Sequence, residues 1–340
     1  MRSSRDRIAA SVGAPGVGAD FVDPLVQAID DVVGHDGFVL LGFDPDSGLR
    51  SFMASRDGIG EPRRYTHNEW IENDVNRYVD LAVADVPVGV LHDSSRKVVS
   101  SPRLHEILRP GGIHAELRLA LRDRSRLWGA LVLYRSDPHD RFTDQDVRRI
   151  LDLADPLREA VIRHPMRHQE VTRTDTPAGV MVLDRDDEVV SMTSEARAWL
   201  RQALAGGLGE EVPGRIHRAV YEVARVARDP HAPTRPPTAR LRSGSGRWIA
   251  ITASQLDGTT GHVAVVLQQA SLGQMLPAAA AWFRLTQRET DVLRLASHGG
   301  SARSVARSLR LSQYTVNDHL TSIYRKAGVR GRDGLLDLIT

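Results

Sequence analysis

The sequence LSQYTVNDHLTSIYRKAG, residues 311–328, has the pattern of a helix with one apolar and one polar side. Four apolar residues follow the spacing i, i+4, i+7 and i+11, which puts them on one side of an α-helix. They are Val316, Leu320, Ile323 and Ala327. Ser312 stands where an N-cap is expected. The same spacing turns six other side chains outward: Gln313, Tyr314, Asn317, Asp318, Thr321 and Arg325.

Shorter helical patterns lie on both sides of this stretch. Thr286 is followed three positions later by Glu289, which is the spacing of a capping box. Gly299 and Gly300 then end that helix. The patterns together predict an all-α domain over residues 284–340. Its four helices are expected within residues 285–300, 301–311, 312–327 and 331–339.

Two short helices joined by a tight turn are an arrangement that reads the major groove of DNA. The second of them has amide, hydroxyl and carboxylate groups in its first half. We expect Asn317, Asp318 and Thr321 to contact bases. Phosphate contacts are expected from the polar and basic side chains around them: Arg303, Arg307, Ser312, Tyr314, Thr315, His319, Arg325 and Lys326. The alternative is an ordinary surface helix of a bundle, which would leave the cap, the turn and the local charge without a common reason.

The charge of the chain is uneven. The whole chain has a net charge of +2, whereas residues 278–340 hold ten Lys and Arg against five Asp and Glu. The rest of the chain therefore carries about −3. A basic terminal segment on a nearly neutral body favours a nucleic acid partner, here double-stranded DNA.

These residues resemble the LuxR-type helix-turn-helix family. The family pattern L-T-x-R-E is met at 285–289, V-A-x-x-L at 305–309, and S-x-x-T-V-x-x-H-x-x-x-I-x-x-K at 312–326. The resemblance implies binding as a homodimer to inverted half-sites. It also places Asn317, Asp318 and Thr321 at the base-reading positions. Ala327 departs from the pattern, since the family usually has Leu there.

The patterns in the first two thirds of the chain predict two α+β domains. Residues 37–55 and 113–135 read as antiparallel hairpins, and residues 142–162 as a helix capped by Thr143. This order of elements resembles GAF domains. Residues 177–270 repeat such an order on a smaller scale and resemble a PAS-like domain. Both resemblances imply sensor domains with antiparallel sheets and helices.

The GAF resemblance implies a small-molecule pocket or a dimerisation surface. A pocket would be covered by the variable middle of the domain, which makes four residues candidates for its lining: Tyr65, Trp70, Asn73 and Tyr78. The alternative is that these aromatic residues are ordinary packing.

The sequence gives little indication of a catalytic site or a metal site. The chain has no Cys, which excludes disulfides, thiolate metal sites and a Cys nucleophile. Three His-Asp pairs occur at predicted turns, beginning at His35, His92 and His139. His164 and His168 have the spacing of a helical metal site, but the proline at position 165 breaks such a helix. We therefore expect no enzyme activity, no metal and no cofactor.

Two other sensor types are disfavoured. A phosphorylated receiver needs an acidic pair and a late Lys, and Lys97 is the only lysine before the terminal domain. An acyl-homoserine-lactone receptor would have a Tyr between Trp70 and Asp74, and this chain has none there.

The expected domain organisation has six parts. They are a flexible tail over 1–20, a GAF-like domain over 21–164, a linker over 165–176, a PAS-like domain over 177–270, a linker over 271–283 and the helix-turn-helix domain over 284–340. No run approaches the roughly 18 apolar residues of a membrane span, and the first residues lack the apolar core of a signal peptide. We expect a cytoplasmic location and no membrane partner.

The function expected from the sequence is that of a one-component DNA-binding transcriptional regulator. Its C-terminal domain would bind operator DNA as a homodimer, and its N-terminal domains would sense a small-molecule effector or mediate dimerisation. RNA polymerase is a further candidate partner. The alternative is a DNA-tethered scaffold for other proteins, without a ligand-controlled switch.

Overall fold

The structure is a computed structural model. It describes residues 4–13, 19–56, 62–92, 101–124, 126–166, 176–205, 217–229, 236–243, 246–258 and 261–339. Most of the predicted linker over 165–176, including His168, lies outside these residues, and so does Lys97. Among the described residues, no helix combines the length and apolarity that crossing a membrane requires.

The first domain contains a five-stranded antiparallel sheet in the order β2-β1-β5-β4-β3. The strands are β1 Gly37–Phe43, β2 Arg50–Arg56, β3 Val88–His92, β4 Ala115–Asp123 and β5 Arg126–Arg135. The helices are α1 Ser4–Gly13, α2 Ala19–Asp30, α3 Pro62–Trp70, α4 Tyr78–Val83, α5 Asp144–Leu151 and α6 Ala154–Arg163. Three short helical turns are η1 Arg103–Leu108, η2 Arg109–Gly111 and η3 His164–Met166.

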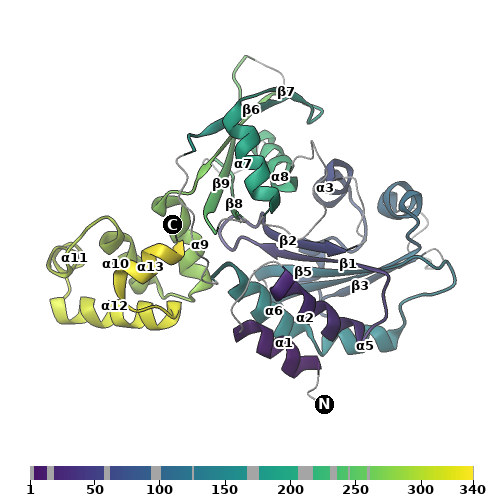
Figure 1. The fold of residues 1–340 in the computed structure, drawn as a ribbon, viewed down its shortest axis with the longest axis horizontal. Coiled ribbons are helices and arrows are strands. Elements are labelled where there is room, and N and C mark those ends of the chain that lie inside the picture. The colour runs from purple at the N-terminus through teal and green to yellow at the C-terminus, as the bar shows by residue number, and fades with distance from the viewer. Residues whose placement is uncertain are drawn as a thin grey trace.

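One face of this sheet is covered by α1, α2, α5 and α6 (Figure 1). Alternate residues of β4 supply that face, since Leu117, Leu119 and Leu121 are buried in the same core as the helices. Thr143 caps α5 by accepting a hydrogen bond from the amide of Asp146, as predicted. The expected single helix is divided, because Pro156 has no N–H to continue the helical bonding across residue 152.

Part of the flexible tail expected over 1–20 forms a helix instead. Residues Ser4–Gly13 are helical, and this α1 contacts α2 and α6. Ile8 is fully buried. The segment shows no apolar periodicity in the sequence, and the burial of Ile8 depends on the packing of α1 against α2 and α6.

The second domain has a five-stranded antiparallel sheet in the order β7-β6-β10-β9-β8. The strands are β6 Gly179–Leu183, β7 Val189–Met192, β8 Thr238–Arg242, β9 Trp248–Gln255 and β10 Val263–Gln269. Helices α7 Ser194–Ala205 and α8 Arg218–Arg228 pack on one face. Counted from its own first strand, this order is the same as in the first domain. The PAS-like assignment itself stays a prediction.

The terminal domain contains helices α10 Gln287–Ser297, α11 Ala302–Leu309, α12 Gln313–Ala327 and α13 Gly331–Ile339. The sequence predicted a linker over 271–283. The structure corrects this prediction, because most of the segment forms a helix, α9 Leu272–Trp282. Ser271 and Gln274 form a capping box at its start. Its residues Met275, Ala279 and Trp282 are buried in one core with α10, α12 and α13.

Buried ion pairs connect the first and second domains, and the terminal domain lies to one side of both (Figure 1). Strand β2 lies beside β8, and Arg240 of β8 forms an ion pair of 2.8 Å with Asp44, in the turn after β1. Arg50 of β2 pairs with Glu222 of α8 at 2.6 Å. These ion pairs join the first and second domains.

Candidate nucleic-acid interface

Local hydrogen bonds fix both ends of α11 and the start of α12. Ser301 accepts from the amide of Ser304 at 3.2 Å, and Ser312 accepts from the amide of Thr315 at 3.0 Å. Between the helices Arg310 has a left-handed backbone, with φ of 54°, and ends α11. Two caps and one left-handed residue therefore make the tight turn that joins the two helices.

The apolar seam of α12 faces the domain core as predicted. Val316 and Ile323 are fully buried, and Leu320 and Ala327 pack against the same core while partly exposed. Helix α12 contacts α10, α11 and α13. This packing determines which side of α12 faces solvent.

The polar side of α12 is exposed. Tyr314 is 76% exposed, and Asn317, Asp318, Thr321 and Arg325 are also in the exposed class. The Thr321 hydroxyl donates to the carbonyl of Asn317 at 2.9 Å. The three predicted base-reading residues therefore share one open surface, which we call the reading face: Asn317, Asp318 and Thr321.

The residues predicted to contact phosphates differ in how exposed their side chains are. Arg303 and Arg307 are exposed on α11, and Arg325 is exposed near the end of α12. Ser312 is exposed and already bonded to Thr315, whereas Thr315 and His319 are half-buried. Exposed basic side chains therefore lie on α11 and near the C-terminal end of α12.

Lys326 has a different position from the one expected. Its ammonium group lies 2.6 Å from the carboxylate of Glu289 on α10 and also donates to the carbonyl of Arg284 at 3.2 Å. Glu289 further accepts from the hydroxyl of Ser322 and the amide of Thr286. Lys326 therefore ties α12 to the start of α10, a role that the capping-box spacing alone did not predict.

Replacing Glu289 with Gln is expected to lower the free energy of unfolding by about 1–2 kcal/mol, a value reduced because solvent screens part of the interaction. Burial alone would raise the pKa of Glu289, but hydrogen bonds from Lys326, Thr286 and Ser322 lower it from 4.5 to about 2. The stabilisation is therefore complete above pH 4.5 and is lost as the pH falls toward 2.

The measurement is urea unfolding of the full chain above pH 4.5 and again at about pH 3. The variant should be less stable than the wild type by more at the higher pH. Asp337→Asn, at an exposed position of α13, is the matched control and should show no such difference. An equal difference at both pH values would contradict the assigned role of Glu289.

The predicted ligand-lining residues of the first domain do not all meet. Tyr65 and Tyr78 are buried and line a small cavity beside Arg50, Tyr134 and Arg218. That cavity has room for about one water molecule. The other two residues do not line this cavity. Trp70 packs against the core of the second domain because α3 lies on α8, and Asn73 is exposed.

A network of buried charges fills the space on this side of the sheet. Glu116 and Arg118 of β4 are fully buried. Arg103 donates to Glu116 at 2.9 Å, and Arg118 donates to Glu69 at 2.7 Å. Although burial pushes the pKa of Glu116 up, the guanidinium groups of Arg103 and Arg118 hold it below its ordinary value. The carboxylate is therefore ionised and paired.

The hydroxyl of Tyr65 completes the network by donating to Glu116 at 2.8 Å. Tyr65 and Tyr78, two of the three aromatic residues chosen from the sequence, thus lie beside this buried polar network. Sequence reasoning missed Glu116 and Arg118, whose alternation with leucines is also the pattern of a strand with a solvated face.

No cluster of three His, Cys, Asp or Glu residues within the described ranges is placed to hold a metal ion. The imidazole of His35 lies 3.2 Å from the carboxylate of Asp30, and its Nδ1 donates to the carbonyl of Val33 at 3.0 Å, as a side chain of an ordinary turn does.

Comparison with known families matches two parts of the chain. Residues 284–339 match the family described as bacterial regulatory proteins, luxR family, and residues 19–161 match the GAF domain. Curated relatives from Mycobacterium bovis and Mycobacterium tuberculosis, whose names describe candidate HTH-type transcriptional regulators, are each 39% identical over 74 residues. This stretch is 22% of this chain and 8% of each relative, so the chain spans only a small part of their length.

Similar solved structures include single domains and one longer protein. The phycoerythrobilin-bound GAF domain of a cyanobacterial phytochrome is 14% identical, with 49% of this chain and 96% of that chain covered and a TM-score of 0.36. A structure of SdiA from Escherichia coli is 12% identical, with 98% and 94% covered and a TM-score of 0.37.

Proposed function

Because the chain carries an N-terminal GAF domain and a C-terminal helix-turn-helix domain of the LuxR family, we propose that it is a transcriptional regulator that binds operator DNA as a homodimer. The observation that carries the proposal is the reading face of α12, which is exposed while the apolar seam behind it is buried. An α-helix fits the major groove, and the first turns of such a helix reach the base edges.

The reading face offers three kinds of base contact. Asn317 can bond bidentately to the N6 and N7 atoms of adenine, and Asp318 can accept from the amino group of cytosine. Thr321 can contact a thymine methyl group or a base edge. Arg303, Arg307 and Arg325 would meet phosphates and set the orientation of the helix.

The way the terminal domain is docked supports this proposal. Trp248 of β9 stacks on Trp282 of α9 and donates to the carbonyl of Leu338 in α13. Arg284, between α9 and α10, pairs with Glu159 of α6 at 2.6 Å. The reading face lies on a different part of the domain and stays exposed in this arrangement. DNA can therefore approach α12 without the sensor domains leaving.

The sensor domains would act on the geometry of the dimer. An effector changes DNA affinity only if it binds one arrangement of the two chains better than another. A ligand with equal affinity for both arrangements would have no effect on the occupancy of two half-sites.

The experiment that tests the proposal is selection of DNA by the full chain from a random-sequence pool, followed by footprinting and light scattering of the complex. The expected product is an inverted repeat occupied by two chains, with half-sites about one helical turn apart. Recovery of DNA without any shared sequence, or of a single half-site with one chain, would contradict it.

A further inference from the structure

Tyr314 of α12 is the one aromatic side chain that the fold leaves in solvent. Every Phe, Trp and Tyr of the chain lies within the described residues, and Tyr314 alone among them is exposed, at 76%. Its hydroxyl forms no hydrogen bond with the described residues. A single exposed apolar group is ordinary on a protein surface, so the position of Tyr314 on the helix decides what it can do.

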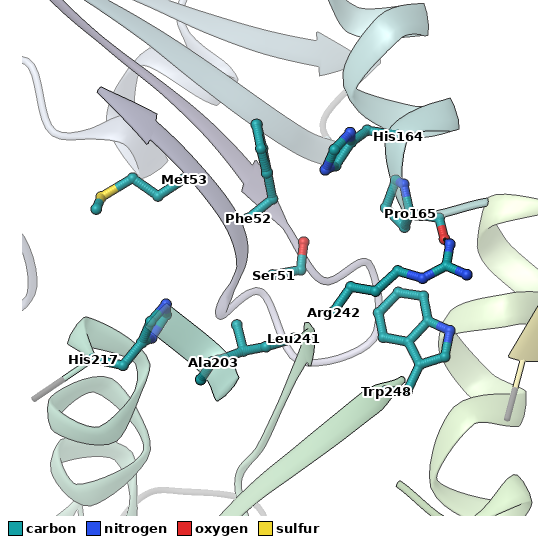
Figure 2. A pocket seen from close by; sticks show the side chains of 10 residues that line it. All are labelled: Ser51, Phe52, Met53, His164, Pro165, Ala203, His217, Leu241, Arg242 and Trp248. Carbon is teal, nitrogen blue, oxygen red and sulfur yellow. Dashed lines mark hydrogen bonds between the residues drawn. The ribbon is translucent and has the colours of Figure 1, made fainter. Parts of the chain in front are cut away.

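The other large aromatic rings fill space between elements. Trp248 is an example, and Figure 2 shows its ring at the pocket between the first and second domains. The ring stacks on Trp282 of α9, with centroids 5.1 Å apart, and both side chains are buried. The pocket itself has room for only about one or two water molecules. Tyr314, by contrast, belongs to none of the hydrophobic clusters that the described residues form.

The spacing along α12 places Tyr314 directly opposite the buried seam. The seam begins at Val316 and follows the spacing i, i+4, i+7 and i+11. A second line with the same spacing begins two positions earlier, and all of its members are exposed: Tyr314, Asp318, Thr321 and Arg325. Two positions correspond to about 200° of rotation around an α-helix. This second line therefore runs along the middle of the solvent-facing side, and Tyr314 lies one turn before the two residues of the reading face that belong to it.

This position favours a base contact over the phosphate contact that the sequence predicted for Tyr314. A helix in the major groove points the middle of its exposed side at the base edges, whereas the side chains on its flanks meet the sugar-phosphate backbone. The first turn of such a helix is the part that reaches the bases. Tyr314 is the second residue of α12, so it satisfies both conditions.

The chemistry of the ring selects the base. Among the bases of the major groove only thymine presents an apolar group, its C5 methyl, and apolar side chains recognise it by direct contact. The ring of Tyr314 offers apolar carbon atoms along its faces and edges. Its neighbours Asn317 and Asp318 offer hydrogen-bonding groups instead, which suit the polar edges of other bases.

We infer that Tyr314 is a specificity-determining residue that packs its ring against the C5 methyl group of one thymine in each half-site. The inference rests on the proposed function, since it requires α12 to lie in the major groove. It adds to the reading face a contact that recognises a base by its methyl group. Loss of that methyl group should lower the affinity about fourfold per half-site, the effect of leaving one methyl-sized group without an apolar contact.

Deoxyuridine is the probe, because it lacks only the methyl group of thymidine and pairs with adenine in the same way. In the operator that the full chain selects, each thymine is replaced in both half-sites together, and the affinity is measured. At one position the wild type should lose about tenfold or more, since two contacts are removed. Tyr314→Phe keeps the ring and should show the same loss. Tyr314→Ala should bind the thymine and deoxyuridine operators equally well at that position.

Thr321→Ser is the matched control. It removes the methyl group of another residue on the same line and should leave the loss at the Tyr314 position intact. Because both side chains are exposed, the variants are expected to keep the melting temperature of the wild type. The deoxyuridine series with the wild type does not depend on how any variant folds.

Three results would overturn the inference while leaving the proposed function in place. The first is a selected operator without any fixed A·T pair. The second is the same deoxyuridine pattern in the wild type and in Tyr314→Ala. The third is an equal loss of affinity for every sequence in Tyr314→Phe, which would assign the hydroxyl to a phosphate. If the full chain selects no DNA at all, the proposed function fails and the inference fails with it.

Discussion

Replacing Asp44 with Asn is expected to lower the free energy of unfolding by about 3–5 kcal/mol. Both carboxylate oxygens of Asp44 lie 2.8 Å from one guanidinium nitrogen of Arg240, and both side chains are almost completely buried. Asn has nearly the same shape but no charge. Among the described residues, Arg240 would then keep its ion pair with the partly exposed Asp46 and its hydrogen bond to the carbonyl of Gln274. Removing one member of a buried pair leaves an uncompensated charge, which is the reason for the large loss.

Urea unfolding of the full chain measures this loss of stability. The control is a variant that removes one partner of an exposed ion pair. Asp186→Asn removes a partner of Arg185 in a pair whose two side chains are 72% and 73% exposed, so we expect no measurable change. Asp44 joins the two sensor domains, and the variant should therefore also let them separate before the rest unfolds. A loss below about 1 kcal/mol would mean that the pair is solvated and does not hold the domains together.

Replacing Trp248 with Ala is expected to cost about 3–5 kcal/mol, the usual range for removing a buried aromatic side chain. The variant loses the stacking on Trp282 and the hydrogen bond to Leu338. Both partners belong to the terminal part of the chain, so its docking on the second domain should weaken as well. Trp248→Phe keeps an aromatic ring but not the indole N–H, and we expect a loss of about 1 kcal/mol from the hydrogen bond.

Hydrogen exchange locates the effect of the Trp248 variants. In Trp248→Ala the amides of α9 and α13 should exchange faster, while those of β4 and β5 in the first domain should be unchanged. Unchanged exchange in α9 and α13 would show that the terminal domain is held by other contacts.

The helix-turn-helix could be predicted from the sequence because its signals are local. The seam of Val316, Leu320 and Ile323 and the cap at Ser312 lie within one stretch of chain, and the structure confirms the orientation that they predict. The strands could be predicted in the same way, because apolar and polar residues alternate along them. A period of 3.6 or 2 residues fixes which side of an element is buried, provided that one side is apolar.

The parts that could not be predicted depend on contacts between distant segments. Glu116 and Arg118 alternate with leucines as surface residues would, and only Arg103 and Glu69, brought over by other elements, allow them to be buried. Trp70 was expected near the tyrosines of the first domain, but the contact of α3 with α8 turns it toward the second domain.

Helix α9 is an intermediate case, because its capping box could have been read from the sequence. Ser271 and Gln274 have the required spacing, but this alanine-rich stretch was predicted to be a linker. Pro277 is the sixth residue of α9 and has no N–H to bond to the carbonyl of Gly273, so the helix continues with one hydrogen bond fewer.

The central claim of this account is that the exposed side of α12 reads DNA, and Asn317 tests it most directly. The measurement is the affinity of Asn317→Ala for the selected operator and for operators with each base changed, with Gln287→Ala on α10 as the exposed control. The account predicts a loss of about 1–3 kcal/mol for Asn317→Ala and a relaxed preference at one base pair, with neither effect in the control. An Asn317→Ala chain that keeps both the affinity and the base preference of the wild type would contradict the account.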